Sequence, residues 1–335
     1  MSTENTNKTI SVIGAGAWGT ALAQALALSG KEVTLWARED NVAQSINDSN
    51  ENKTYLPGTS LSQRIMATSD LSRAASSDIL LIVTPAQHVR ATLQSMAPTV
   101  KDGTCVVLCA KGIEIDTGLP LSKVAAEILP HAQISVLTGP TFAAEIAKGL
   151  PSAMTLACAD KDAAKALRET LSTKTLRLYV TDDVLGAQIG GAVKNVIAIA
   201  CGIIHGLGFG ESARAALVTR GLAEMGRLAS AMGAKRETLM GMCGMGDLML
   251  TCSSMQSRNF SLGAALGGGK SLADILAERK SVTEGVHTAH ALITLAQKNA
   301  VEMPIAEAVY ACLTGAKSVH DIVNDILERP LPEAV

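Results

Sequence analysis

The sequence predicts a chain of the α/β class, in which an N-terminal parallel-sheet domain is followed by an all-α C-terminal domain. Three observations support this prediction. Short apolar runs alternate with amphipathic segments in the first half, no strand-like run follows residue 184, and 335 residues exceed the size of most single cores. We expect the boundary between residues 183 and 184, so that the domains span residues 1–183 and 184–335.

Runs of Val, Ile and Leu predict the strands of the first domain. Because these runs are continuous rather than alternating, they are typical of parallel strands covered on both faces. We expect strands at Thr9–Ile13, Glu32–Trp36, Asp78–Thr84, Thr104–Ala110, Ile134–Leu137 and Ala153–Cys158. The amphipathic segments between them predict helices at Trp18–Ser29, Gln87–Met96, Leu119–Leu129 and Lys161–Leu171.

Long segments with helical periodicity make up the second half of the chain. We expect helices at Val184–Ile204, Ala213–Met232, Leu262–Ala265, Leu272–Glu278, Val286–Asn299, Ile305–Thr314 and Val319–Leu327. The first is apolar enough to raise the question of a membrane span. Gln188, Lys194, Asn195 and several glycines within it favour a buried helix, so no stable membrane insertion is expected.

Composition argues against several classes of partner and site. The net charge of −2 gives no reason to expect nucleic-acid binding. Seven scattered cysteines, most of them flanked by aliphatic residues, lack the spacing of zinc or redox sites. We expect them to be buried thiols of a cytoplasmic protein. His287 and His290 have no third ligand of metal type beside them, so no metal site is expected.

The stretch Gly14-Ala-Gly-Ala-Trp-Gly19 follows an apolar strand and opens an Ala- and Leu-rich helix. In that context the pattern Gly-x-Gly-x-x-Gly predicts a Rossmann-like dinucleotide site. Gly14 allows the tight turn, Gly16 lets the backbone approach the pyrophosphate, and Gly19 packs the helix against the strand. The N–H groups at the helix N-terminus then bind the phosphates.

Arg38 lies at the end of the second strand, where a site strict for NAD would usually carry Asp or Glu. Its guanidinium could pair with a 2′-phosphate or stack on adenine. Glu39 and Asp40 follow directly, so the preference between NAD and NADP stays open. We expect NADP to be at least accepted.

Lys194 is the only residue with a full charge in the apolar run Ile189–Cys201. An ammonium there must find a polar partner or lose its proton, because desolvation lowers a lysine pKa. Such a lysine can exchange protons near neutral pH. Gly190 and Gly191 precede it by one turn and leave room for a ligand or another backbone. The structural alternative is a lysine whose head reaches water.

Two candidate substrate contacts follow predicted strands. Lys111 comes after the strand that ends at Ala110, at the carboxyl end where open parallel sheets bind ligands. Thr141, in the stretch Gly139–Ala143, follows another strand and is a candidate helix cap and hydrogen-bond donor. The alternative for Lys111 is a solvated charge.

Two further candidates lie in the helical half. Asp247 is expected on a flexible bend that begins at Gly244, and its alternative is a helix cap. Ser257, Arg258 and Asn259 precede a helix and combine a cationic fork, an amide and free N–H groups, which suits a phosphate or carboxylate. Ser257 alone could be only an N-cap, and Arg258 alone only a surface residue.

In this order, the motifs resemble those of bacterial-type NAD(P)-dependent glycerol-3-phosphate dehydrogenases. The matching stretches are Gly14–Thr20, Cys109–Gly112, Thr138–Ala143, Gly190–Ile197, Thr219–Met225, Gly244–Leu248, Gln256–Asn259 and Val282–Gly285. The resemblance covers nearly the whole chain. It implies a Rossmann-like domain followed by an all-helical one, in a cytoplasmic enzyme that supplies glycerol 3-phosphate for phospholipid synthesis.

The resemblance also implies roles for single residues. Lys194 would be the proton donor or acceptor. The substrate would contact Lys111, Gly139, Thr141, Lys194, Asp247, Ser257, Arg258 and Asn259. The cofactor, NAD or NADP, would contact Gly14, Gly16, Ala17, Trp18, Gly19, Arg38, Lys111, Ala143, Arg258, Val282 and Glu284. Asn195 and Thr251 would belong to the same polar surroundings. Ala17 departs from the serine that relatives often carry, and the segment Thr84–His88 is given no role.

The resulting hypothesis is reversible hydride transfer between the nicotinamide and dihydroxyacetone phosphate or glycerol 3-phosphate, in a protein expected to be a homodimer. Two alternatives remain at this point. One is a β-hydroxyacid or ketopantoate-type reductase, which also joins a Rossmann domain to helices. The cluster at Ser257–Asn259, together with Lys111, favours a phosphorylated substrate over the substrates of these reductases. The other is a non-catalytic NAD-sensing protein, which would not need a desolvated lysine.

Overall fold

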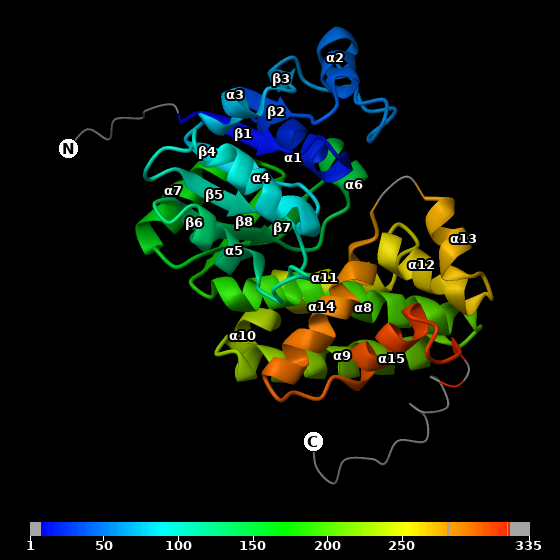
Figure 1. The fold of residues 1–335 in the computed structure, drawn as a ribbon. Helices are drawn as coiled ribbons and strands as arrows, with labels where there is room; N and C mark the ends of the chain where they lie inside the picture. Colours follow the sequence, from blue (N-terminus) through cyan, green and yellow to red (C-terminus); the bar gives the residue numbers. More distant parts are fainter. Residues whose placement is uncertain (1–7, 280–281, 320, 322–335) are drawn as a thin grey trace. The chain divides into compact units, whose positions relative to one another are not determined.

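In the computed structural model, residues 8–279, 282–319 and 321 are described (Figure 1). They form two compact units. The first, here called the sheet unit, comprises the described residues up to Lys111 together with Pro120–Ala187. The second, the helical unit, comprises Gly112–Leu119 and the described residues from Gln188 onward. The α/β class with a helical second half is confirmed.

The sheet unit is built on one eight-stranded sheet with the order β3-β2-β1-β4-β5-β6-β7-β8. Its strands are β1 (Ile10–Ile13), β2 (Val33–Trp36), β3 (Ile65–Thr68), β4 (Ile79–Ile82), β5 (Cys105–Leu108), β6 (Gln133–Thr138), β7 (Ser152–Cys158) and β8 (Leu176–Thr181). All neighbouring pairs are parallel except β6 and β7. The strand order reverses between β1 and β4, and open α/β sheets bind ligands at the carboxyl ends of strands at such a point.

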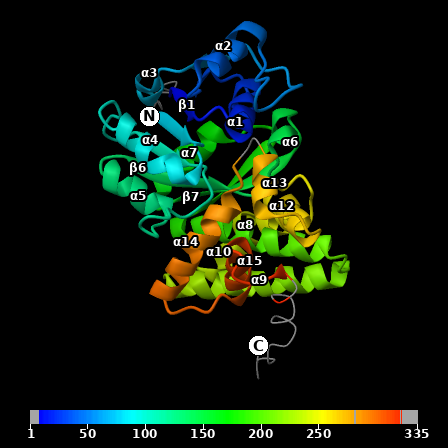
Figure 2. The ribbon, with the colours of Figure 1, turned by 45° about the vertical axis from the view of Figure 1, so that its right-hand side comes forward.

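Helices cover both faces of the sheet. Every residue of β4 and β5 is buried, and successive strand residues point to opposite faces, so neither face is open to water there. The helices are α1 (Ala17–Leu28), α2 (Asp40–Ser49), α3 (Leu71–Ala75), α4 (Val89–Met96) with the short turn η1 (Ala86–His88), α5 (Leu121–Ile128), α6 (Ala143–Ala147) and α7 (Lys161–Leu171). Helix α1 packs against α6, and α4 packs against α3 and α5 (Figure 2).

Two features of the sheet were not predicted. Strands β3 and β8 were missed because exposed residues interrupt their apolar pattern, with Met66 53% and Tyr179 51% exposed. The antiparallel pairing of β6 with β7 was also not anticipated. The short helix α6 and a turn are enough to join two antiparallel strands, whereas parallel neighbours need a longer crossover.

The helical unit contains α8 (Val184–Gly206, which begins in the sheet unit), α9 (Glu211–Ala231), α10 (Arg236–Leu239), the π-helical turn η2 (Met242–Gly246), α11 (Asp247–Cys252), α12 (Arg258–Gly267), α13 (Leu272–Ala277), α14 (Glu284–Lys298) and α15 (Pro304–Leu313). In the most apolar part of α8, 94% of the residues are buried. The expectation of a buried core helix is therefore confirmed. The helix expected at Val319–Leu327 falls almost wholly outside the described residues.

Helices α8 and α12 approach each other closely through glycines. A Cβ atom on Gly202 would lie 2.1 Å from the Phe260 carbonyl oxygen, and one on Gly263 would lie 2.1 Å from the Ile199 carbonyl oxygen. Neither position has space for a side chain. Because the two backbones are in contact, the first turn of α12 is held at a defined position on α8.

Candidate functional site

The glycine-rich turn lies between β1 and α1, in the sheet unit. Gly14 has φ +121°, and its N–H donates to the Trp36 carbonyl oxygen at the end of β2. A Cβ atom on Gly19 would lie 1.9 Å from the Gly14 carbonyl oxygen, so the helix packs on the turn as predicted. A Cβ atom on Gly16 would instead point into open space. A side chain there would fill the space in front of the helix.

The N-terminus of α1 fits a pyrophosphate. Its N-cap is Gly16, no side chain caps its first N–H groups, and its first turn has no acidic residue. Ala17 and Trp18 open this helix, and both are partly buried against the core of the sheet unit. The Trp18 indole nitrogen is buried without a hydrogen-bond partner among the described residues. The turn can therefore receive the phosphates of a dinucleotide.

Arg38 follows β2 and is exposed, forming an ion pair of 3.2 Å with Glu39. The carboxyl ends of β1 and β2 are adjacent, so the guanidinium lies on the same edge of the sheet as the glycine turn. A single exposed ion pair is weak, so Arg38 can exchange this partner for a ligand phosphate. The geometry is compatible with both NAD and NADP.

Lys111, Gly139 and Thr141 come together at the carboxyl ends of β5 and β6. The Lys111 ammonium donates to the Gly139 carbonyl oxygen at 3.0 Å, and the Thr141 hydroxyl donates to the same oxygen at 3.5 Å. A Cβ atom on Gly139 would lie 2.8 Å from the Met154 Cα, so only glycine fits there. Ala143 opens α6, next to α1. Lys111, Gly139 and Thr141 therefore lie together in the sheet unit.

Lys194 lies on α8 and is buried, with its side chain 7% exposed. Its ammonium donates to the Asp247 carboxylate at 2.5 Å and to the Thr251 hydroxyl at 2.7 Å. The Thr251 hydroxyl also contacts the Asp247 backbone carbonyl oxygen at 2.6 Å. Of the two outcomes that the sequence left open, a polar partner is the one found. The structural alternative, a lysine whose head reaches water, does not fit a side chain that is 7% exposed.

The local structure around Asp247 differs from the prediction. We expected a flexible bend at Gly244–Asp247, but these residues form the π-helical turn η2 and the first position of α11. A Cβ atom on Gly190 would lie 2.4 Å from the Cys243 carbonyl oxygen, so this glycine makes room for another backbone. Asp247 is 1% exposed, and the turn places it directly against α8.

Ser257, Arg258 and Asn259 form the start of α12. Ser257 is the N-cap and accepts a hydrogen bond from the Phe260 N–H at 3.2 Å. The Asn259 side chain donates to the Asn195 side-chain oxygen and accepts from the Gly285 N–H, both at 2.9 Å. Asn259 therefore links α8, α12 and α14. The hydrogen bond between the Gly285 N–H and Asn259 was not predicted from the sequence.

Arg258 contacts the segment that leads into α14. Its guanidinium donates to the Val282 carbonyl oxygen at 2.8 Å. Burial lowers the pKa of Arg258, and the charge of the Glu284 carboxylate partly opposes this effect. Val282, Glu284 and Arg258 are thus close together, as the resemblance implied. Arg258 is exposed to solvent, and an accessible cation at the start of a helix is suited to bind an anionic group.

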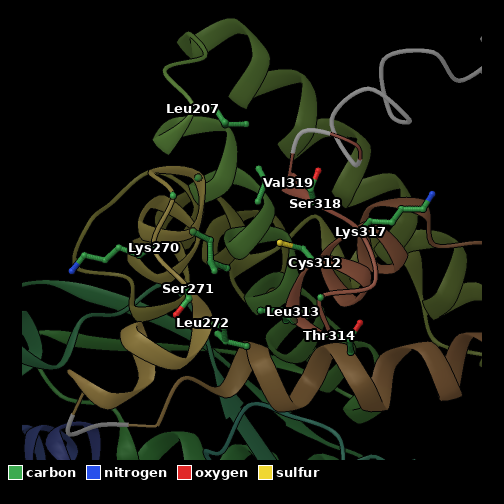
Figure 3. Close-up of a pocket in the computed structure, with 14 residues that line it drawn as sticks. Leu207, Lys270, Ser271, Leu272, Cys312, Leu313, Thr314, Lys317, Ser318 and Val319 are labelled. Atoms are coloured by element: carbon green, nitrogen blue, oxygen red, sulfur yellow. The ribbon is translucent and has the colours of Figure 1, made fainter.

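Other sites are less suited to this chemistry. None of the seven cysteines, all of which lie in the described residues, forms a disulfide bond, and six of them are buried. Within the described residues, no group of three or more His, Cys, Asp or Glu could hold a metal ion. A cavity of about 510 Å³ in the helical unit is lined by residues that include Leu207, Lys270, Cys312 and Thr314 (Figure 3). No residue that the sequence predicted as functional lines it.

Comparisons with known proteins identify the family. A model of the N-terminal part of NAD-dependent glycerol-3-phosphate dehydrogenase matches residues 9–164, and the model of its C-terminal part matches residues 183–324. The chain belongs to this family. It is 57% identical over 321 residues to the glycerol-3-phosphate dehydrogenase [NAD(P)+] of Parvibaculum lavamentivorans, with 96% of each chain covered. The activity of the enzyme is accordingly that of an NAD(P)-dependent glycerol-3-phosphate dehydrogenase.

Solved structures agree with the family. The crystal structure of glycerol-3-phosphate dehydrogenase from Coxiella burnetii superposes with a TM-score of 0.93 at 38% identity, covering 96% of this chain and 99% of that one. A ketopantoate reductase from Ralstonia eutropha reaches a TM-score of 0.62 at 16% identity, covering 93% of this chain and 98% of that one. The second likeness shows a shared fold only. The reductase and NAD-sensing alternatives are therefore not supported for this dehydrogenase.

Proposed function

We propose that this dehydrogenase interconverts dihydroxyacetone phosphate and sn-glycerol 3-phosphate, with Lys194 as the group that gives and takes the proton. The buried contact of Lys194 with Asp247 and Thr251 is the observation that carries the proposal. A bound nicotinamide cofactor supplies or accepts the hydride at the substrate C2 carbon. In the reducing direction the ketone oxygen becomes negative, and a proton must reach it as the hydride arrives.

The surroundings of Lys194 suit proton transfer. Asp247 and Thr251 fix the ammonium by hydrogen bonds and so hold it in position for proton exchange with a substrate oxygen. In the reducing direction Lys194 gives its proton to the alkoxide oxygen, and in the oxidising direction it takes the proton from the C2 hydroxyl. Asp247 balances the charge of the protonated lysine and acts as its positioning partner.

The phosphate of the substrate would bind at the start of α12. Arg258 supplies charge, Asn259 an amide, and the helix N-terminus free N–H groups. Binding energy from this remote group then orients the reacting carbon. We assign the other substrate contacts to Lys111, Gly139, Thr141, Asp247 and Ser257.

The cofactor would bind at the carboxyl ends of β1 and β2. We assign its contacts to Gly14, Gly16, Ala17, Trp18, Gly19, Arg38, Lys111, Ala143, Arg258, Val282 and Glu284. Gly16 and the uncapped N-terminus of α1 support the pyrophosphate contact. Arg38, exposed beside that turn, supports acceptance of NADP as well as NAD.

Three further parts of the proposal concern the whole protein. Residues 1–183 would act as the dinucleotide-binding domain and residues 184–335 as the substrate-binding and catalytic domain. The enzyme would be a cytoplasmic homodimer. Its product, glycerol 3-phosphate, would serve phospholipid synthesis.

A spectrophotometric assay tests the proposal directly. Oxidation of NADH and NADPH is followed with dihydroxyacetone phosphate and, in parallel, with dihydroxyacetone and ketopantoate. We expect turnover with dihydroxyacetone phosphate and at least a 100-fold lower kcat/KM with the ketones that lack phosphate, since one charged anchor is missing. Equal kcat/KM with and without the phosphate would overturn the assignment of the α12 site.

A further inference from the structure

Arg279 contacts the same segment as Arg258, although nothing in the sequence drew attention to it. Its guanidinium donates to the Arg258 carbonyl oxygen at 2.7 Å and to the Ser261 hydroxyl at 3.1 Å, both in the first turn of α12. A longer contact of 3.4 Å reaches the Thr283 hydroxyl at the N-cap of α14. One side chain therefore connects the starts of two helices.

The contacts of Arg258 and Arg279 are complementary. Arg258 donates from its side chain to the Val282 carbonyl oxygen, and Arg279 holds the backbone of Arg258 itself. Without Arg279, Arg258 would keep its contact with Val282, and its carbonyl oxygen would keep only the longer hydrogen bond of 3.3 Å from the Ser261 hydroxyl among these side-chain donors. The two arginines thus link α12 to the residues before α14 from both sides.

The charge of Arg279 also matters. Its three hydrogen-bond acceptors within the described residues are neutral oxygens, so none of these bonds cancels its positive charge. Burial lowers the pKa of Arg279, and the positive charge of Arg258 lowers it further, whereas the Glu278 carboxylate opposes the shift. Glu284 acts in the same way on Arg258, so the two carboxylates offset part of the positive charge that the two arginines present to an anion.

We propose that Arg279 is a positioning residue that holds Arg258, Val282 and Glu284 in the arrangement needed to bind an anionic ligand, the dinucleotide cofactor. The inference rests on the proposed function, because it takes these three residues as cofactor contacts. A planar guanidinium suits the role better than an ammonium, since its fork reaches acceptors on α12 and at the N-cap of α14 together.

The test compares Arg279→Ala and Arg279→Lys with the unchanged enzyme. Dissociation constants of NADH and NADPH are measured by fluorescence titration, and KM and kcat by the dihydroxyacetone phosphate assay. For Arg279→Ala we expect the dissociation constant of the cofactor and the KM for the cofactor to rise about tenfold. This is the size expected for the loss of one hydrogen bond to a charged group. We expect kcat to fall less than threefold. Arg279→Lys keeps the charge but not the fork, and should recover only part of the affinity.

Controls separate this role from a general loss of structure. Arg227 also donates from its guanidinium to a backbone carbonyl oxygen, that of Glu302, and neither residue belongs to the proposed site. Arg227→Ala should leave the cofactor dissociation constant within twofold of normal. If Arg279→Ala does not fold, Arg279→Lys is measured in its place, at a temperature where circular dichroism shows it folded.

The outcomes distinguish the inference from the proposed function. An unchanged cofactor dissociation constant in Arg279→Ala, or in Arg279→Lys where only that variant folds, would overturn the role of Arg279. If Arg258→Ala weakens cofactor binding at the same time, the proposed site stands and only the inference fails. If Arg258→Ala also binds the cofactor normally, the proposed site itself is wrong. A fall in kcat with normal cofactor affinity would likewise contradict the inference.

Discussion

Glu224 provides a prediction about stability that depends on pH. It lies on α9, is 2% exposed, and accepts a hydrogen bond of 2.8 Å from the Ile305 N–H in the first turn of α15. Its other carboxylate oxygen is buried without a hydrogen-bond partner in the described part of the chain. Burial raises the pKa of Glu224 from 4.5 to about 7, although the backbone N–H groups of Ile305 and Ala306 and the charge of Arg227 oppose the shift.

The sign and size of the effect follow from that shift. Between pH 4.5 and 7 the folded protein holds a proton on Glu224 that the unfolded chain has released. The contribution to stability is therefore fully present below pH 4.5 and is lost as the pH rises through about 7. A shift from 4.5 to about 7 corresponds to about 3 kcal/mol at pH 8. Glu224→Gln cannot ionise, so its stability should lack this loss.

The assay is urea unfolding at pH 5, 6, 7 and 8, followed by circular dichroism because both tryptophans, Trp18 and Trp36, lie in the sheet unit. Relative to Glu224→Gln, the unchanged enzyme should lose about 3 kcal/mol of unfolding free energy between pH 5 and 8. Glu237→Gln, at an exposed position of the helical unit, is the matched control and should follow the unchanged enzyme. Parallel pH curves for Glu224→Gln and the unchanged enzyme would refute the reasoning.

Two other predictions concern the proposed site. Arg38→Asp should raise the NADPH dissociation constant at least tenfold and that of NADH much less, because a carboxylate repels the 2′-phosphate; an unchanged NADPH constant in titrations would disprove the assignment. Asp247→Asn leaves the buried Lys194 ammonium without its carboxylate and should cost about 3 kcal/mol of unfolding free energy. Glu278→Gln, which removes the exposed pair with Lys270, should cost under about 0.5 kcal/mol in the same urea series. Equal losses in these two variants would mean that the Lys194–Asp247 contact adds nothing beyond a surface ion pair.

Much of the fold could be predicted from the periodicity of apolar residues. Strands β1, β4 and β5 are buried on both faces, and their apolar runs predicted them correctly. Strand β3 lies at the edge of the sheet, where Met66 is exposed, so its pattern is diluted. The division of the chain into two compact units was harder to predict, because the segment Gly112–Leu119 belongs to the helical unit. The sequence shows no change of composition there.

The site could be predicted only in part. Lys194 was conspicuous because a single charge stands in an apolar helix, but its partners lie 53 and 57 positions further along the chain. Asp247 is the acidic partner of Lys194 because η2 packs against α8, and this packing cannot be read from the sequence. Arg279 stands in a charged run and looks like a surface residue. Its acceptors are backbone and hydroxyl oxygens, which leave no pattern in a sequence.

The most direct test of the central claim is the turnover of Lys194→Ala with dihydroxyacetone phosphate. General acid–base catalysis contributes about 10²–10⁴-fold, so kcat should fall by that factor. Cofactor affinity, measured by titration, should stay within about threefold, because Lys194 is not among the proposed cofactor contacts. Near-normal kcat in a folded Lys194→Ala enzyme would contradict the account, since another group would then have to supply the proton.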